Sequence, residues 1–369
     1  MHVGIPKEIK IHEYRVGMTP AGVKELTNAS HVVIVEKEAG IGAGFDDAEY
    51  LDAGARIGTQ RDVYAHSEMI VKVKEPQPAE YELLQPAHVL FTYLHLAANP
   101  ALARALLERH VTAIAYETVT ASTGSLPLLT PMSEVAGRMS VQVAAACLQR
   151  VNGGRGILLG GVPGVAPGKV VILGGGVAGM HAATIALGMG ADVTVVDKSL
   201  PRLRELSTHF AGRIKTVYST SAAIASLIAT ADVVIGAALI PGAAAPRLIT
   251  REMLKNMQPG AVLVDIAIDQ GGCFETSHPT THADPIYVVD GIVHYCVANI
   301  PGAVPRTSTL ALTNATLPYI KAIATHGVTR ALLDDVHLAN GLNVYRGEIT
   351  HPAVAQSLDM HYQPFQYAA

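Results

Sequence analysis

Three glycines in the middle of the chain, Gly174, Gly176 and Gly179, follow an apolar run and precede a stretch of helical composition. Glycines at this spacing allow a tight turn, a close approach of backbone to a pyrophosphate, and close packing of a helix on a strand. The N-terminus of the following helix would meet phosphate charge with its amides. The motif favours a dinucleotide-binding turn over a purely structural glycine turn.

A carboxylate ends the next apolar run. Asp197 lies 18 residues after Gly179, where an acid would accept hydrogen bonds from the ribose hydroxyls of adenosine. This position favours NAD over NADP. Lys198 and Arg202 weaken that preference, because their positive charges could accommodate a 2′-phosphate.

Side chains suited to carboxylate binding and proton transfer occur before the glycine motif. Arg15 follows the expected first strand and could bind a carboxylate through two hydrogen bonds. Lys74 and His95 each follow an apolar run, and α/β sheets bind ligands at the carboxyl ends of their strands. Strand alternation would place Lys72 and Lys74 on one side, and imidazole suits proton transfer near neutral pH. A surface ion pair for Arg15 and a solvated Lys74 are the alternatives.

A further acid follows a later apolar run. Asp269 comes after residues 262–268 and precedes Gly271 and Gly272. Asp269 could hold a water or exchange protons, and the backbone of residues 266–269 could line a nicotinamide. The alternative is an Asp that caps a turn before Gly271.

Strand-length apolar runs alternate with helical segments, which is typical of parallel α/β sheets. A chain of 369 residues predicts two domains. Residues 131–149 and 307–325 read as connecting helices, with Ser133 near the start of the first as a cap or ligand. We predict two Rossmann-like, doubly wound domains. The substrate domain is discontinuous, residues 1–130 and 301–369, and an NAD-binding domain of residues 131–300 is inserted in it.

The composition excludes several classes of protein. Hydrophobic residues make up 49% and charged residues 16% of the chain, which predicts extensive burial that includes subunit contacts. A net charge of −4 without a basic tract argues against nucleic acid and anionic membranes as partners. The apolar runs are too short to span a bilayer. No secretory signal is present and the cysteines are too few for disulfides or zinc, so we expect a cytoplasmic protein without a metal site.

Taken together, these motifs resemble the bacterial L-alanine dehydrogenases along essentially the whole chain. The resemblance covers the glycine motif and eight further segments: Arg15-Val16 with Thr19-Pro20, residues 73–76, 94–97, 115–118, 131–133, 153–156, 264–272 and 298–301. It implies reversible oxidative deamination, in which L-alanine, NAD and water give pyruvate, ammonium and NADH. Catalysis is then expected in the cleft between the domains.

The resemblance implies roles for individual residues. Arg15 and Lys74 would bind the carboxylate and carbonyl side of the substrate, and His95 and Asp269 would be the acid/base groups. Fixed cations and proton donors around C2 would stabilise the charge that develops during hydride transfer. The cofactor would contact Ser133, Val177 and Ala178 at the pyrophosphate, Asp197 and Arg202 at the adenosine, and Ser219, Ala238, Leu239, Ile266, Ala267, Ile268, Asp269, Val297, Ala298, Asn299 and Ile300 beyond them.

Three positions are left out of the predicted site. His278 stands where some relatives have Arg, so we leave it out of the cofactor set. Glu117 and His326 form a conceivable magnesium pair, but two ligands far apart in sequence do not predict a site. Members of the family are commonly hexamers, which fits the apolar composition.

Three other functions compete with this interpretation. The NAD(H)-binding component of a proton-translocating transhydrogenase resembles the chain around Arg15 and the glycines, but it does no amino-acid chemistry. His95 within residues 94–97 and the lack of membrane spans favour the dehydrogenase. Saccharopine dehydrogenase should lack the segments 94–97 and 265–272, and a non-catalytic NAD-binding module would bind the cofactor without turnover.

Overall fold

The computed structural model describes residues 1–238 and 245–365 of the chain. These residues form two compact units. Unit 1 contains residues 1–132 and the described residues from 304 onward, and unit 2 contains the described residues of 133–303. Leu239 lies outside the described residues.

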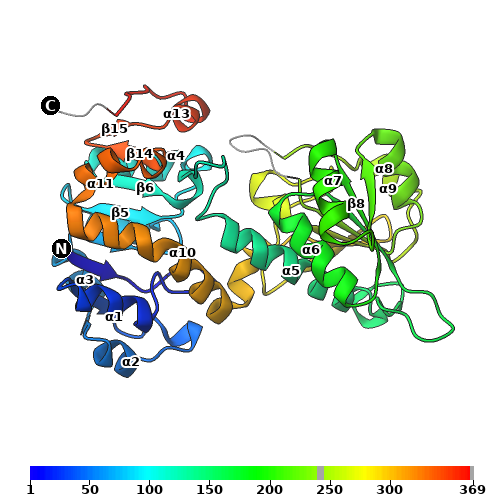
Figure 1. Cartoon of the computed structure of the whole chain (residues 1–369), viewed down its shortest axis with the longest axis horizontal. Helices are drawn as coiled ribbons and strands as arrows, with labels where there is room; N and C mark the ends of the chain where they lie inside the picture. The colour runs from blue at the N-terminus through cyan, green and yellow to red at the C-terminus, as the bar shows by residue number, and fades with distance from the viewer. Residues whose placement is uncertain (239–244, 366–369) are drawn as a thin grey trace. The chain divides into compact units, whose positions relative to one another are not determined.

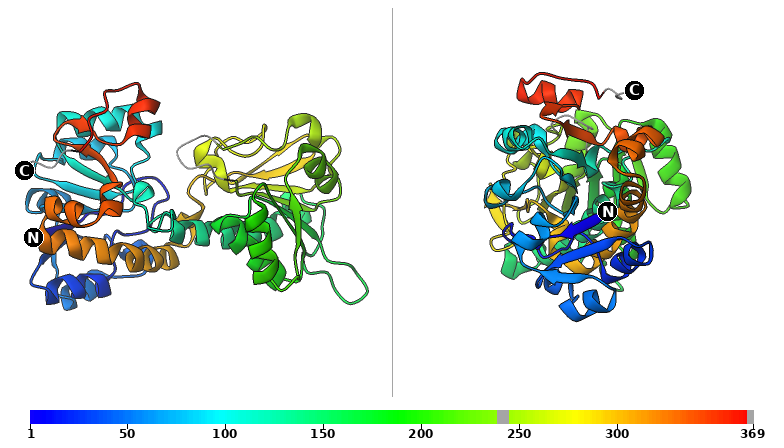
Figure 2. Two further views of the ribbon diagram at one scale, coloured as in Figure 1. Left: turned by 45° about the horizontal axis from the view of Figure 1, so that its top comes forward. Right: turned by 90° about the vertical axis from the view of Figure 1, so that its left-hand side faces the viewer.

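Unit 1 is built on an eight-stranded sheet (Figure 1). Its strands are β1 (His2–Ile5), β2 (Val32–Glu36), β3 (Arg56–Gly58), β4 (Met69–Val71), β5 (Val89–Thr92), β6 (Thr112–Ala115), β14 (Leu342–Tyr345) and β15 (Glu348–Ile349). The order is β15-β14-β6-β5-β4-β1-β2-β3, and the strands β1 to β6 pair with one another in parallel. Strand β14, which comes late in the chain, pairs antiparallel with β6, so the last part of the chain returns to the first sheet (Figures 1 and 2).

Several helices of unit 1 begin at a side chain that caps them. Thr19 accepts a hydrogen bond from the Gly22 amide at the start of α1, and Asp46 and Thr59 form capping boxes at α2 and α3. The long helix α10 packs against α1 and α11. The helices are α1 (Pro20–Asn28), α2 (Asp47–Asp52), α3 (Gln60–Ala65), α4 (Pro100–Glu108), α10 (Pro305–His326), α11 (Val328–Asp334), α12 (Val336–Ala339) and α13 (Pro352–Leu358).

Unit 2 has a seven-stranded sheet in the order β12-β13-β11-β10-β7-β8-β9. Among the strand pairs that the described residues form in this sheet, only the pair of the edge strand β12 with β13 is antiparallel. The strands are β7 (Lys169–Leu173), β8 (Asp192–Asp197), β9 (Lys215–Tyr218), β10 (Val233–Gly236), β11 (Val262–Asp265), β12 (Ile286–Val289) and β13 (Ile292–Tyr295). The predicted run at 286–289 is this antiparallel edge, and β13 inserts between it and β11.

Helices cover both faces of this second sheet. Val170 and Ile172 belong to one apolar core and Val171 and Leu173 to another, so alternate side chains of β7 are buried on opposite faces. The helices are α5 (Thr130–Cys147), α6 (Val177–Gly188), α7 (Leu200–His209), α8 (Ser221–Ile228) and α9 (Arg251–Leu254). Both sheets contain the Rossmann strand order 3-2-1-4-5-6, which confirms the prediction of an α/β protein with two doubly wound sheets.

Both connecting helices are present, with slightly different bounds. The segment predicted as 131–149 is α5, and the segment predicted as 307–325 is α10. Because α5 begins at Thr130, Ser133 lies within its first turn, and the expectation that Ser133 caps the helix is wrong. None of the helices within residues 1–238 and 245–365 is long and apolar enough to cross a membrane.

Candidate functional site

Four adjacent strands in unit 1 are followed by the substrate candidates Arg15 and Lys74, the acid/base candidate His95, and Glu117. Arg15 follows β1, Lys74 follows β4, His95 follows β5 and Glu117 follows β6. In this sheet the strand order reverses between β1 and β4. Ligands of open α/β sheets bind at such a reversal, beyond the carboxyl ends of the strands. The fold therefore brings these four residues to the ligand-binding edge of one sheet.

Arg15 is held by a carboxylate two residues away. Its Nε donates to Glu13 Oε1 at 2.7 Å, its Nη2 donates to Glu13 Oε2 at 2.5 Å, and its Nη1 lies 3.0 Å from Met132 Sδ. Arg15 is only 2% exposed. Its ion pair with Glu13 is therefore buried, in contrast to the surface ion pair of the alternative interpretation. Burial alone would lower the pKa of Arg15, but the Glu13 charge outweighs it and holds this pKa above its ordinary value. The guanidinium is a permanent cation of fixed orientation.

Lys74 does not lie on an alternating strand, because β4 ends at Val71. Lys72 is instead completely buried, with its Nζ 2.8 Å from Glu80 Oε1 and 3.2 Å from Glu8 Oε2. The expectation that the strand continues through both lysines is wrong, since this buried ion pairing directs Lys72 into the unit. Lys74 is 8% exposed, so it is not the solvated lysine of the alternative interpretation.

His95 combines an accessible imidazole with an unusual backbone. Its φ of 48° lies in the left-handed region, and its side chain is 41% exposed. The His95 amide donates to Glu117 Oε1 at 2.6 Å, and the His95 Nδ1 lies 4.0 Å from the same oxygen. The ring stacks on Tyr93 with centroids 6.0 Å apart and 12° between planes. Tyr93 in turn donates to the carbonyl of Leu128 at 2.5 Å.

Glu117 is therefore engaged with the protein backbone. Its carboxylate accepts the amides of both Leu94 and His95. His326 is the exposed last residue of α10. Across residues 1–238 and 245–365, no group of three or more His, Cys, Asp or Glu side chains is placed to hold a metal ion.

The three glycines of the central motif have different surroundings in unit 2. Gly174 has a φ of 108°, and a Cβ there would lie 2.7 Å from the backbone of Ala237 at the end of β10. A Cβ on Gly179 would collide with the carbonyl of Gly174. A Cβ on Gly176 would meet no heavy atom within 4 Å. The first and third glycines are needed for packing, whereas the second faces open space that a ligand could occupy.

The N-terminus of α6 lies at this open space. Ser199 and Thr220 cap α7 and α8 with their hydroxyls, but no side chain among the described residues caps α6 at Gly176. Amides at such a helix end attract phosphate through their partial positive charge. The donor set and the open approach fit a pyrophosphate, which would contact the backbone of Val177 and Ala178.

The start of α5 packs against the same turn. A Cβ on Gly137 would collide with the carbonyl of Ala178, so the two helices are in close contact here. Ser133 lies four residues before Gly137, on the same face of α5. Ser133 is half-buried and lies one helical turn before this contact.

Asp197 and Arg202 hold the glycine turn from the neighbouring strand and helix. Asp197 Oδ2 accepts the Gly175 amide at 2.7 Å and its Oδ1 accepts the Ser199 amide at 2.7 Å. Arg202 Nε donates to the Gly175 carbonyl at 2.6 Å, and its Nη1 pairs with Glu205 at 2.6 Å. Both side chains therefore already have protein partners, while Lys198 is exposed.

The remaining candidate cofactor residues follow the other parallel strands of unit 2. Ser219 follows β9, Ala238 follows β10, the 3-10 turn Ile266–Gln270 follows β11, and residues 297–300 follow β13. They lie at the same edge of the sheet as the glycine turn, since all these strands are parallel. Leu239, which is the next candidate in sequence, is outside the described residues.

Asp265, which precedes the exposed Asp269, caps the 3-10 turn. The buried Asp265 carboxylate accepts the Ala267 amide at 3.1 Å, the Cys273 amide at 2.8 Å and the Ser277 hydroxyl at 2.6 Å. Burial raises the pKa of Asp265 above its ordinary value, and these hydrogen bonds oppose the rise. The residue that caps this turn is thus Asp265, whereas the sequence had offered that role as the alternative for Asp269.

The sequence did not reveal which carboxylates form hydrogen bonds with the candidate residues. Glu13 orients Arg15, Glu8 accepts the Lys74 amide, and the pairing of Glu117 with His95 spans 22 residues. Only Glu13 had a local signal, since it stands two residues from its partner.

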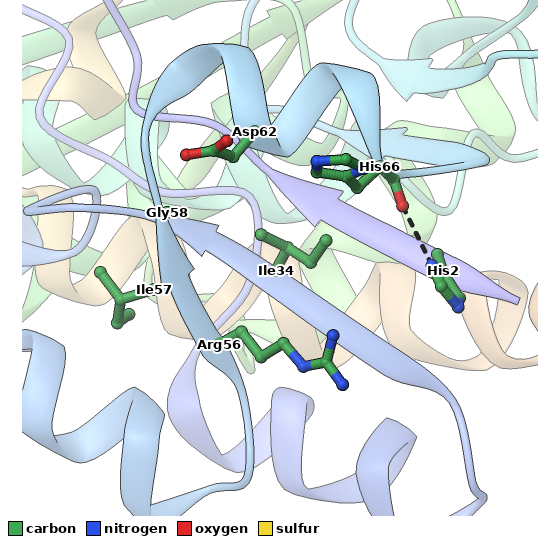
Figure 3. A pocket seen from close by; sticks show the side chains of 7 residues that line it. All are labelled: His2, Ile34, Arg56, Ile57, Gly58, Asp62 and His66. Atoms are coloured by element: carbon green, nitrogen blue, oxygen red, sulfur yellow. Dashed lines mark hydrogen bonds between the residues drawn. The ribbon is translucent and has the colours of Figure 1, made fainter.

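A pocket elsewhere in unit 1 contains none of the candidate residues. Figure 3 shows it between the edge strand β3 and helix α3, where His2 Nδ1 lies 3.0 Å from the carbonyl of His66. Its other lining residues are Ile34, Arg56, Ile57, Gly58 and Asp62. The pocket is therefore separate from the candidate site.

These features define a Rossmann-type α/β protein with a glycine-rich nucleotide turn in its second unit. Two family models match the chain: alanine dehydrogenase/PNT, N-terminal domain, over residues 4–136, and alanine dehydrogenase/PNT, C-terminal domain, over residues 140–352. The chain belongs to the alanine dehydrogenase/PNT family.

Its relatives match along nearly the full length. An alanine dehydrogenase from Halomonas elongata is 58% identical over 363 residues, 98% of each chain. A solved structure of an L-alanine dehydrogenase has a TM-score of 0.94 and 54% identity, covering 97% of this chain and 99% of the other. A transhydrogenase structure from Sinorhizobium meliloti has a TM-score of 0.81 and 28% identity, covering 96% and 100%. The glycine motif alone would not have separated these two functions.

Proposed function

We propose that this chain is an NAD-dependent L-alanine dehydrogenase. It converts L-alanine, NAD and water reversibly into pyruvate, ammonium and NADH. The observation that carries this proposal is the high identity, over the whole chain, to proteins named alanine dehydrogenase. The positions of Arg15, Lys74 and His95 at the ligand-binding edge of one sheet support it.

Arg15 and Lys74 act on the substrate. The guanidinium of Arg15, oriented by Glu13, binds the substrate carboxylate, and the Lys74 ammonium stabilises negative charge on the C2 oxygen of pyruvate. The assignment is supported by their burial, because an ion pair with a substrate is stronger where water is excluded.

His95 and Asp269 are the acid/base groups. Bound NAD would supply the acceptor for the hydride that leaves the α-carbon of alanine, so the substrate passes through iminopyruvate. His95 and Asp269 then remove and return the protons of the attacking water and the departing ammonia, through the carbinolamine. Their exposure supports this role, because a proton-transfer group must reach both the substrate and solvent.

Unit 2 supplies the cofactor site. The amides that begin α6 would hold the pyrophosphate, for which Gly176 leaves room, and Asp197 and Arg202 would hold the adenosine side. Further contacts come from the candidate residues after the parallel strands. We accordingly propose residues 131–300 as the NAD-binding domain and residues 1–130 with 301–369 as the substrate domain.

The test is NADH oxidation in the presence of pyruvate and ammonium. We expect turnover that needs both substrates and that falls strongly with NADPH, because Asp197 repels a 2′-phosphate. Tight NADH binding without any pyruvate- and ammonium-dependent turnover would instead favour the transhydrogenase component or a non-catalytic module.

We also propose a cytoplasmic homohexamer that acts in alanine catabolism. The low charged fraction supports extensive subunit contacts. Light scattering should give a mass about six times that of the 38.7 kDa chain.

A further inference from the structure

Glu8 is a buried carboxylate that the proposed chemistry does not use. It is 7% exposed and follows β1. Its Oε1 accepts the amide of Val73 at 2.6 Å and the amide of Lys74 at 3.2 Å, and its Oε2 lies 3.2 Å from Lys72 Nζ. Each of these partners is a donor, so the geometry requires both oxygens of Glu8 as acceptors.

These contacts complete the backbone hydrogen bonding where β4 has ended. The carbonyl of Val73 accepts the Tyr93 amide at 3.3 Å, and the carbonyl of Lys74 accepts the Thr92 hydroxyl at 3.0 Å. The amides of Val73 and Lys74 go to Glu8. Buried backbone amides without a partner cost free energy, so Glu8 supplies the hydrogen-bond acceptor that a neighbouring strand would otherwise provide. The backbone that carries Lys74 is thereby tied to the end of β1.

Glu80 provides a natural comparison, because it pairs with the same lysine. Glu80 Oε1 lies 2.8 Å from Lys72 Nζ and accepts the Tyr64 hydroxyl at 2.9 Å. Its Oε2 accepts the Gln77 amide at 2.7 Å, at the start of the 3-10 turn Pro78–Leu83. The backbone contacts of Glu80 are thus to a different segment from those of Glu8.

We propose that Glu8 is a positioning residue for the reaction, which fixes the backbone at Lys74 so that the Lys74 ammonium meets the substrate oxygen. This inference rests on the proposed role of Lys74. A lysine side chain is long and flexible, so its reach depends on a fixed backbone. Arg15 lies after the same strand as Glu8, so one segment following β1 positions both substrate cations.

The decisive variant is Glu8→Gln. An amide has one acceptor oxygen, so its NH2 group must face either the Lys72 ammonium or the two backbone amides, donor against donor. We expect the KM for pyruvate to rise about 10- to 100-fold, because small misplacements of binding groups have effects of this size. NADH affinity should stay within about twofold, because the glycine turn belongs to unit 2.

Glu80→Gln is the matched control. It also removes one carboxylate charge from Lys72, so it should lower the midpoint of thermal unfolding comparably, but the KM for pyruvate should stay within about twofold. Glu8→Asp keeps the charge and withdraws the oxygens, and it should raise this KM too. In a Lys74→Ala background, Glu8→Gln should have no further effect on the KM, because the positioned group is gone.

The outcomes separate this proposal from the proposed function. If the parent protein lacks pyruvate- and ammonium-dependent NADH oxidation, the function itself is wrong. If the parent is active but Glu8→Gln and Glu80→Gln raise the KM for pyruvate equally, Glu8 has only a structural role. The same conclusion follows if the effect of Glu8→Gln persists in full without Lys74.

Discussion

Replacing Gly176 with Ala tests whether the open space at the glycine turn is a phosphate site. The backbone has φ −64° and ψ −162°, at the edge of the extended region, and the added methyl group meets no heavy atom within 4 Å. Ala in a compatible conformation changes the free energy of unfolding by only ~0.4–1 kcal/mol, through the unfolded chain. Thermal unfolding of the variant without cofactor should therefore stay close to that of the parent.

The same methyl group should weaken NADH binding. It would stand where a pyrophosphate oxygen approaches the amides that begin α6, and losing one hydrogen bond to a charged group costs about 1.5–3 kcal/mol. This loss corresponds to about 10- to 150-fold in Kd. A titration that follows NADH fluorescence measures the change directly.

Gly179→Ala is the contrasting variant. Its methyl group collides with the carbonyl of Gly174, and such overpacking typically costs about 1–3 kcal/mol of stability. Gly179→Ala should therefore lower the unfolding midpoint, whereas Gly176→Ala should not. Parental NADH affinity in Gly176→Ala would refute the phosphate site, and a stability loss as large as that of Gly179→Ala would refute the open space.

Three further predictions concern the acid/base pair, the carboxylate clamp and the thiols. His95→Ala and Asp269→Asn should each lower alanine turnover by about 10²- to 10⁴-fold while NADH affinity changes little, and near-normal alanine oxidation by either variant contradicts the acid/base assignment. Arg15→Ala should raise the KM for pyruvate at least about tenfold, from the loss of charge-assisted hydrogen bonds, and an unchanged KM in steady-state assays excludes the clamp. The buried thiols of the folded protein should resist an aromatic disulfide reagent at pH 8, because burial raises their pKa above the ordinary value of 9.0. The pKa rises to about 11 for Cys147 and Cys296 and to about 12 for Cys273. These pKa values are higher in the folded state, so the stability that the protonated thiols contribute is complete below pH 9 and is lost as the pH rises through 11. The midpoint of thermal unfolding should therefore fall between pH 9 and pH 11. Rapid labelling of the thiols at pH 8 would contradict the prediction that they resist the reagent.

Local patterns in the sequence were sufficient to predict much of the fold. The run before Gly174 forms β7, the helix after the glycines forms α6, and the two connecting helices differ from their predicted bounds by at most two residues. These signals are reliable because glycine spacing and hydrophobic periodicity act over a few residues. Short strands such as β3 and β13 escaped prediction, since their pairing partners decide them.

The candidate site was predicted only in part, because its geometry depends on contacts between distant residues. The strand through Lys72 and Lys74 was a wrong prediction, since Glu8 and Glu80 draw Lys72 into a buried ion network. No local pattern connects Glu117 with the left-handed backbone of His95.

By itself, the sequence determined the alternation of strands and helices, the glycine turn, and which side chains follow strand ends. Those properties are local, because they depend on backbone preferences and periodicity. Only the tertiary structure decided which glycine faces open space, which carboxylate orients each cation, and that Asp265 caps the turn before Asp269. These facts depend on burial and on hydrogen bonds between segments far apart in the chain, where every polar group must find a partner as water is removed.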